Sequence, residues 1–304
     1  MVMEELHLPD NIKVHFAGCE VQNQFLPVYE LGVSYGLYTA FPFVERMVFK
    51  KGKSPIMPMK WMTNPSIDIP VFCAKKMKHC IQDSGLFTLM FGSCKGKHDD
   101  NLIYKWYDKL VEFTLEHNNG ATCVEVDCQK VLGVKAAWDL RKRMRDDLPN
   151  NRIINVFHLE DGQRGLDELI DFSEYIAISV PELRFAGKKN WVTSIARYIK
   201  KRKPTIDIHL LGCTELQLLK KNRFCTSCDS TSYVAGKRFG FIKGRHISRI
   251  KTDRIREMIT DPKYQLIRTM NNEQNSNFMA LSIELLKKEY ENSAGSQDYY
   301  YNLK

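Results

Sequence analysis

Eight short apolar runs alternate with helix-like segments along most of the chain, and this alternation limits the fold more than any other feature. The runs are the expected strands, at residues 12–18, 32–38, 80–83, 122–127, 152–158, 175–179, 206–212 and 223–229. Strands separated by helices form parallel sheets. Eight such units within about 250 residues predict an α/β fold of the (β/α)8, TIM-like barrel type. A doubly wound open sheet is the alternative.

The segments between the runs carry helix signals. Residues 100–117 repeat apolar side chains at the 3.6-residue spacing of an amphipathic helix, and Asn118-Asn119-Gly120 is a suitable C-terminal stop. Residues 131–148 and 190–203 behave similarly, and Pro204 closes the second of them.

The alternation breaks near residues 40–70, which hold five prolines and are typical of an insertion on the loop face. This segment is either a plain insertion or a flap that contacts substrate. We expect a catalytic barrel over residues 1–250, a C-terminal helical extension over 251–292 and a flexible tail over 293–304.

The amino-acid composition indicates the size of the core, the kind of partner and the cellular compartment to expect. Its 304 residues are 43% hydrophobic, enough for a large core, and its formal net charge of +9 favours a polyanionic partner without proving one. The nine cysteines are scattered, the first residues are acidic, and no run approaches the ~20 apolar residues of a membrane span. We expect a cytoplasmic protein with reduced thiols and no membrane contact.

Three of the expected strands end at an aspartate: Asp83, Asp127 and Asp229. The loops after the strand ends of a barrel build its active site, so these carboxylates are expected at one rim. Two carboxylates in one pocket can divide covalent and acid/base work. A single strand-end aspartate is often only a helix N-cap, but three are less readily explained in that way.

The motifs around these aspartates resemble those of a known family. Asp83-Ser84-Gly85-Leu86-Phe87 is similar to the Asp-Ser-Gly-Gly-Phe motif of tRNA-guanine transglycosylases, (β/α)8 barrels that exchange a guanine for a 7-deazaguanine. Asp127 falls where the family has a base-recognising aspartate, and residues 156–162 fall where it has Val-Gln-Gly-Gly. Asp229 follows Leu210-Leu211-Gly212 as the family's nucleophile does. The resemblance covers about residues 10–245.

The departures from the family pattern point to one branch of it. Leu86 stands at the second glycine of the first motif, and His158 replaces a glutamine that contacts the base. The family's zinc module, a Cys-x-Cys-x-x-Cys run with a distant histidine, has no counterpart because no cysteine follows Asp229. The chain is therefore most similar to the zinc-less phage and bacterial relatives that insert 7-deazaguanines into DNA.

The resemblance implies a double displacement at a nucleoside C1′. Asp229 is then the nucleophile that forms a glycosyl ester, and Asp83 is the general acid/base. Asp127 accepts hydrogen bonds from N1–H and the exocyclic amine of the base, as a carboxylate can. Further candidates for contacts with the base are Ser84, His158 and Ser179. For His158, a structural role is an equal alternative.

The implied partners follow from this chemistry. They are DNA, with tRNA as the alternative, and a 7-deazaguanine base such as preQ0. In duplex DNA the target base must leave the stack. No cofactor is expected, a homodimer is left open, and a phage-encoded chain would act in the host cytoplasm.

Two other groups of residues have the composition of binding sites. Cys225 and Cys228 have CxxC spacing and could bind zinc with Cys213, His209 or His246, but they lie in an expected strand and are interpreted as packed free thiols. Residues 237–245 interleave basic, aromatic and glycine residues, which is typical of phosphate contact. The candidates there are Lys237, Arg238, Lys243 and Arg245.

Three other functions are compatible with the sequence. They are a tRNA transglycosylase with an unusual docking surface, a non-catalytic nucleic-acid-binding barrel, and an unrelated two-carboxylate glycoside hydrolase. The presence of both Asp83 and Asp229 counts against the non-catalytic barrel.

Overall fold

The structure is a computed structural model. It describes residues 10–20, 24, 25, 28, 31–49, 77–90, 100–213, 215–234, 241, 242, 245, 246, 283, 286, 287 and 293. Within the described residues, no helix is long and apolar enough to cross a membrane.

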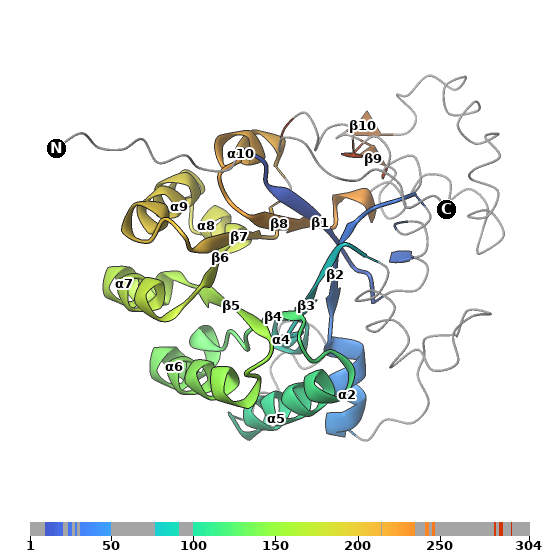
Figure 1. Cartoon of the computed structure of the whole chain (residues 1–304), viewed down its shortest axis with the longest axis vertical. Coiled ribbons are helices and arrows are strands. Elements are labelled where there is room, and N and C mark those ends of the chain that lie inside the picture. Colours follow the sequence, from blue (N-terminus) through green and yellow to red (C-terminus); the bar gives the residue numbers. More distant parts are fainter. Residues whose placement is uncertain are drawn as a thin grey trace.

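Eight parallel strands close into a barrel, as the alternation predicts (Figure 1). They are β1 (Lys13–Ala17), β2 (Tyr35–Thr39), β3 (His79–Asp83), β4 (Thr122–Val124), β5 (Arg152–Phe157), β6 (Tyr175–Ser179), β7 (Asp207–Leu211) and β8 (Ser227–Ser230). Each strand pairs with the next along the chain, and β1 pairs with β8, with Val14 opposite Cys228 and His15 opposite Asp229. The (β/α)8 fold is thereby confirmed, and the open sheet is excluded.

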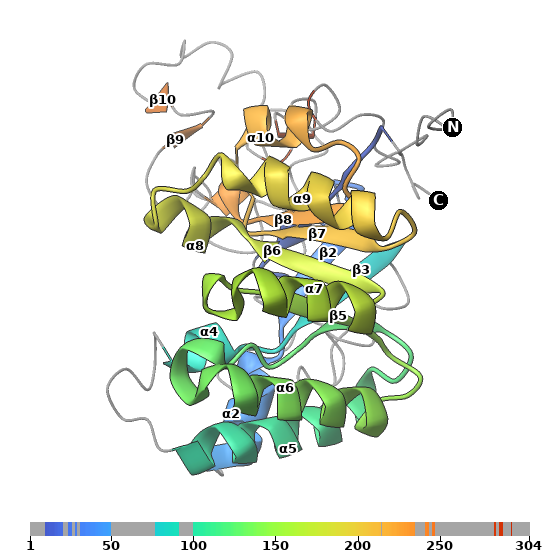
Figure 2. The same cartoon turned by 90° about the vertical axis from the view of Figure 1, so that its left-hand side faces the viewer.

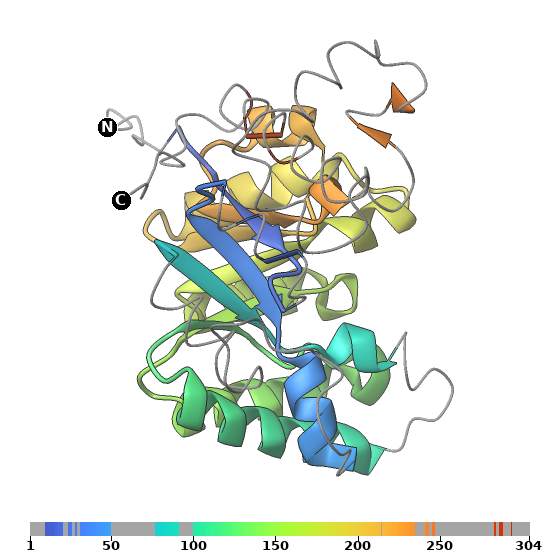
Figure 3. The same ribbon diagram turned by 90° about the vertical axis from the view of Figure 1, so that its right-hand side faces the viewer.

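Among the described residues, the helices lie on the outside of the barrel. They are α2 (Phe41–Phe49), α4 (Leu86–Thr88), α5 (Asp100–His117), α6 (Gln129–Asp147), α7 (Gly162–Phe172), α8 (Val180–Phe185), α9 (Trp191–Arg202) and α10 (Leu216–Lys221), with short 3-10 turns at Leu159–Asp161 and Ser232–Val234. Figure 3 shows β1, β2 and β3 side by side, on the far side of the barrel from α7. A separate pair, β9 (Phe241–Ile242) and β10 (Arg245–His246), is antiparallel.

The strands bury both of their faces, which is why they form nearly continuous apolar runs in the sequence. Side chains such as Ile176, Ile178 and Cys228 pack outward in the main core. Their neighbours along the strands point inward and form a second cluster of Ala17, Leu37, Ile81, Val124, Ile154, Val156, Tyr175 and Ala177. A residue that lies two positions after one of these inward-pointing side chains therefore also points into the barrel, at its rim.

Most element boundaries follow the prediction, and the eighth strand does not. The sequence pattern predicts this strand over residues 223–229, but it spans Ser227–Ser230, so Asp229 lies within the strand and not at its end. The backbone N–H of Cys225 donates to the carbonyl of Asn222, which makes residues 222–225 a turn. Helix α6 begins at Gln129, two residues earlier than expected, and is kinked at Gly133.

The expected insertion, extension and tail fall mainly outside the described residues. In the 40–70 region, only α2 and Ala40 are described. Of the proposed 251–292 and 293–304 segments, only single residues are described.

Candidate active site

The barrel brings the predicted carboxylates to one end. Asp83 is the last residue of β3, Asp127 lies three residues beyond β4, and Asp229 lies near the end of β8. Helices α4 and α8 lie at this same end of the barrel (Figure 2). Asp83 and Asp229 follow the inward-pointing Ile81 and Ser227 by two positions, so both carboxylates point into the mouth of the barrel.

Asp83 is held in a tight turn that fixes its carboxylate. Its Oδ1 accepts the backbone N–H of Gly85 at 2.8 Å. Gly85 has a φ of 75°, and a Cβ built there would lie 2.8 Å from the backbone of Phe41. Only glycine therefore fits this turn, because it tolerates both the left-handed conformation and the close approach of α2.

The surroundings of Asp83 raise the pKa of its carboxyl from 3.8 to about 7. Burial is the main cause, and the negative charges of Asp127 and Asp229 add to it. Hydrogen bonds from Gly85 and the Thr39 side chain act in the opposite direction but are outweighed. The three carboxylates are thus close enough to interact, and Asp83 exchanges its proton near neutral pH.

Asp229 presents one carboxylate oxygen to the barrel wall. Its Oδ1 accepts the backbone N–H of Gly212 at 2.6 Å and lies 3.2 Å from Nε2 of His209. Within the described part of the chain, its other oxygen, Oδ2, accepts no hydrogen bond. The side chain is only 11% exposed. One oxygen is therefore anchored while the other is available for reaction.

A chain of buried hydrogen bonds connects Asp229 to three residues inside the barrel. Nδ1 of His209 lies 2.5 Å from the Ser227 hydroxyl, which lies 2.5 Å from the hydroxyl of Tyr175. An ionised Asp229 can only accept, so the contacts place the ring proton of His209 on Nε2. Tyr175 then donates to Ser227, Ser227 donates to His209, and His209 donates to Asp229. We refer to these four residues as the Asp229 relay.

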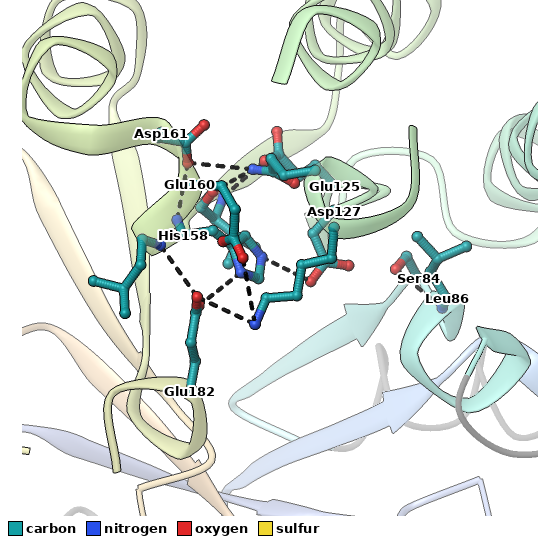
Figure 4. Close-up of polar contacts among 12 residues, drawn as sticks. Ser84, Leu86, Glu125, Asp127, His158, Glu160, Asp161 and Glu182 are labelled. Atoms are coloured by element: carbon teal, nitrogen blue, oxygen red, sulfur yellow. Dashed lines mark hydrogen bonds and ion pairs between the residues drawn. The ribbon is translucent and has the colours of Figure 1, made fainter. Parts of the chain in front are cut away.

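Asp127 is held by a second charged network (Figure 4). Its Oδ2 lies 3.3 Å from Nε2 of His158, and Nδ1 of His158 lies 2.8 Å from Glu182. Burial alone lowers the pKa of His158, but hydrogen bonds to Asp127 and Glu182 and their charges raise it to about 10. His158 is thus a buried imidazolium between two carboxylates, and it uses both ring nitrogens to hold them.

Part of this network has the spacing of a metal site. Ligand atoms of His158, Glu160 and Glu182 lie within 4.8 Å of one another. However, the ammonium group of Lys130 lies 3.2 Å from Glu182 and 4.0 Å from Glu160, which is where a cation would be held. A histidine that binds a metal must be neutral, whereas the raised pKa of His158 favours its protonated ring. These residues do not fit a metal site.

Glu125 and Arg141 form a buried ion pair beneath the Asp127 loop. Arg141 donates to Glu125 through Nε at 2.8 Å and through a terminal nitrogen at 2.7 Å. Glu125 also accepts from the Asn155 side chain at 2.6 Å and the backbone N–H of Val156 at 2.8 Å. The pair ties the end of β4 to α6 and β5.

We expect Glu125→Gln to lower the free energy of unfolding by about 3–5 kcal/mol, because it leaves the guanidinium of Arg141 buried without its counter-charge. Chemical denaturation measures this change. The matched control is Asp108→Asn, which removes an exposed ion pair with Arg143 and should cost less than about 1 kcal/mol. Equal effects of the two substitutions would contradict the prediction.

No protein-family model matches the chain, and no curated protein sequence matches it. Among solved structures, the chain is similar to "QR15, an Aldolase", with 12% identity and a TM-score of 0.43, over 75% of this chain and 93% of that chain. It is also similar to 2,3-dimethylmalate lyase, a member of the PEP mutase/isocitrate lyase superfamily, with 9% identity and a TM-score of 0.36, over 93% of this chain and 95% of that chain. Similarity at this level carries no argument about chemistry.

The remaining predicted site residues are placed as follows. Ser84 is buried, and its hydroxyl accepts the backbone N–H of Leu86 at 3.4 Å. Ser179 ends β6, two positions after the inward-pointing Ala177. Both stay predictions as base contacts. His158 lies at the rim as expected, although in this arrangement its ring nitrogens face carboxylates.

Cys225 and Cys228 are buried free thiols. Burial raises the pKa of both, which disfavours the thiolates that bind zinc. The proposed phosphate-contacting residues Lys237, Arg238 and Lys243 lie outside the described residues, and only the backbone of Arg245, in β10, is described.

Several residues of the site do not show in the sequence the role that the structure gives them. Thr39 is the last residue of β2, one position beyond the expected strand, and His209 lies within β7, where the sequence offers it only as a possible zinc ligand. Lys130 and Glu182 lie in the first turns of α6 and α8. Such first turns follow the strand ends directly, so polar residues there could have been recognised as rim positions.

Proposed function

We propose that the chain is a base-exchange transglycosylase that replaces guanine in DNA with a 7-deazaguanine through a covalent Asp229–glycosyl intermediate. The observation that carries the proposal is the meeting of Asp83, Asp127 and Asp229 at the barrel mouth, with the pKa of Asp83 raised to about 7. The resemblance of the Asp83–Phe87 motif to the transglycosylases supplies the reaction type.

The first half of the reaction uses Asp229 as nucleophile. Its unpartnered Oδ2 attacks C1′ of the deoxyribose, the bond from C1′ to N9 of guanine breaks, and an ester forms. The departing guanine takes the proton of Asp83. The anchored Oδ1 keeps the free oxygen aimed at C1′, as orientation requires.

The second half restores Asp229 as a carboxylate and Asp83 as a carboxylic acid. The incoming 7-deazaguanine gives its N9 proton to Asp83, and its N9 attacks C1′ as the ester bond to Asp229 breaks. Because Asp83 must lose and regain one proton in each cycle, a pKa near 7 suits it. Asp127, oriented by His158, accepts hydrogen bonds from N1–H and the exocyclic amine of the base.

The test is incorporation of radiolabelled guanine, and then of 7-deazaguanines, into duplex DNA, single-stranded DNA and tRNA in parallel. Asp229→Asn is the control for background label. Label in DNA alone supports the proposal, and label in tRNA alone replaces it with the tRNA reaction. No label with any base or nucleic acid would refute base exchange.

We expect His209→Phe to lower kcat for exchange by about 100-fold while leaving KM for DNA unchanged, because His209 positions the nucleophile Asp229 and does not itself contact substrate. Gln places an N–H near the position of Nε2, so His209→Gln should recover part of the loss. Steady-state kinetics measure both variants, with thermal unfolding as a check on the fold. A rise in KM with unchanged kcat would contradict the positioning role.

A further inference from the structure

The most exposed large apolar side chain of the described residues lies beside the candidate active site. Phe185, the last residue of α8, is 83% exposed, and Trp191, the first residue of α9, is 49% exposed. The same short helix buries Val180 and Leu183, so its apolar packing is complete without Phe185. The exposure of Phe185 therefore calls for a role other than core packing.

Each of the two rings carries a cation. The guanidinium of Arg184 lies 5.3 Å from the ring centroid of Phe185, and the ammonium of Lys188 lies 4.4 Å from that of Trp191. Within the described residues, neither cation forms an ion pair with a carboxylate. We call Arg184, Phe185, Lys188 and Trp191 the aromatic–cation surface.

The backbone holds this surface in one arrangement. The N–H of Lys188 donates to the carbonyl of Leu183 at 2.7 Å, and the N–H of Trp191 donates to the carbonyl of Lys188 at 2.8 Å. Gly187, with a φ of 71°, takes the left-handed conformation that ends α8. The rings are thus presented from a structured turn.

The helix that carries Arg184 and Phe185 also contacts the network that holds Asp127. Glu182, one turn before Phe185 in α8, accepts from His158 at 2.8 Å, and His158 in turn contacts Asp127. Figure 2 shows α8 at the end of the barrel where the strands finish. A DNA strand whose base entered the barrel mouth would continue past this end of the barrel, where α8 lies.

We propose that the aromatic–cation surface binds the unpaired nucleotides that flank the exchanged base in DNA, a role that rests on the proposed function. Unstacked bases offer flat π faces to Phe185 and Trp191, and the backbone phosphates complement Arg184 and Lys188. A symmetric dimer would set this surface against its own copy and bring like cations together, so the two cations favour nucleic acid over a second copy of the chain.

The experiment measures binding of fluorescent oligonucleotides of about 15 nucleotides by anisotropy, single-stranded and duplex, at several salt concentrations. The variants are Phe185→Ala/Trp191→Ala and Arg184→Ala/Lys188→Ala. The matched control is Arg145→Ala, because Arg145 lies over the ring of Phe172 at 4.2 Å at the opposite end of the barrel. Thermal unfolding checks each variant, and Phe185→Tyr keeps a ring at the position.

We expect the aromatic variant to weaken single-strand binding at least about 10-fold with its salt dependence unchanged. The cation variant should lower the salt slope by about one for each phosphate that it no longer neutralises. Phe185→Tyr and Arg145→Ala should bind as the unmodified protein does. DNA affinity in the aromatic variant equal to that of Arg145→Ala would overturn the proposal, as would a loss of self-association with unchanged DNA affinity.

The two proposals can fail separately. Exchange that proceeds while the aromatic variant binds DNA normally would reject this surface and leave the transglycosylase intact. DNA binding that depends on the surface, in a protein that exchanges no base, would keep the surface and reject the reaction.

Discussion

Asp229→Asn is expected to lower base exchange by at least about 10⁴-fold, as the loss of a covalent nucleophile does in other enzymes. Asparagine can still accept hydrogen bonds from Gly212 and His209 through its side-chain oxygen, so the fold and the Asp229 relay should persist. The amide has no anionic oxygen with which to form an ester at C1′. The expected loss is therefore chemical and not structural.

Trapping of the intermediate measures the effect directly. The unmodified protein, incubated with DNA and then denatured, should carry a DNA strand attached at Asp229, which peptide mass spectrometry can locate. Asp229→Asn and Asp229→Ala should carry none. An adduct that persists in both variants, or that maps to Asp83, would assign the nucleophile elsewhere.

Asp83→Asn is expected to slow exchange by about 10²–10⁴-fold, the usual contribution of a general acid/base. In the unmodified protein, the rate should depend on an ionisation near pH 7, which is where burial and the charges of Asp127 and Asp229 place the pKa of Asp83. Because the three carboxylates interact, the profile reports the group as a whole. The variant should lose this dependence. An unchanged profile near pH 7 would assign the ionisation to another residue.

The same pKa predicts how stability changes with pH. The carboxyl of Asp83 has a pKa of about 7 when folded and an ordinary value of 3.8, so the folded state holds the proton more tightly. Its contribution to stability is present at pH values below 3.8 and is lost as the pH rises to about 7. Asparagine does not ionise, so Asp83→Asn prevents this loss of stability. The variant should therefore gain stability relative to the unmodified protein between pH 4 and pH 7, as measured by chemical denaturation.

The barrel could be predicted because strands buried on both faces leave a strong apolar pattern. The sequence pattern is least accurate at β8, the least apolar of the eight, where a turn at residues 222–225 replaces the first half of the expected strand. Strand ends such as Asp83 could be placed at one rim by topology alone. The partners of these carboxylates could not, because they come from strands and helices far apart in the sequence.

His158 and His209 illustrate that limit. In the sequence, each is a polar residue in an apolar run, with a base contact as one alternative for His158 and a zinc ligand for His209. The structure instead sets His158 between Asp127 and Glu182, and His209 between Asp229 and Ser227. These arrangements depend on strand register and helix placement, which apolar periodicity does not specify.

The closure of the barrel also has a consequence for synthesis of the protein. Asp229 lies opposite His15, since β8 is completed by pairing with β1. The N-terminal strand must therefore wait through more than 200 residues of synthesis before its partner emerges. Pairing between such distant parts of a chain forms late and slowly. The nascent protein should hold Asp83 and Asp127 long before it can act, so that the proposed reactivity towards DNA arises only when the first and last strands of the barrel pair.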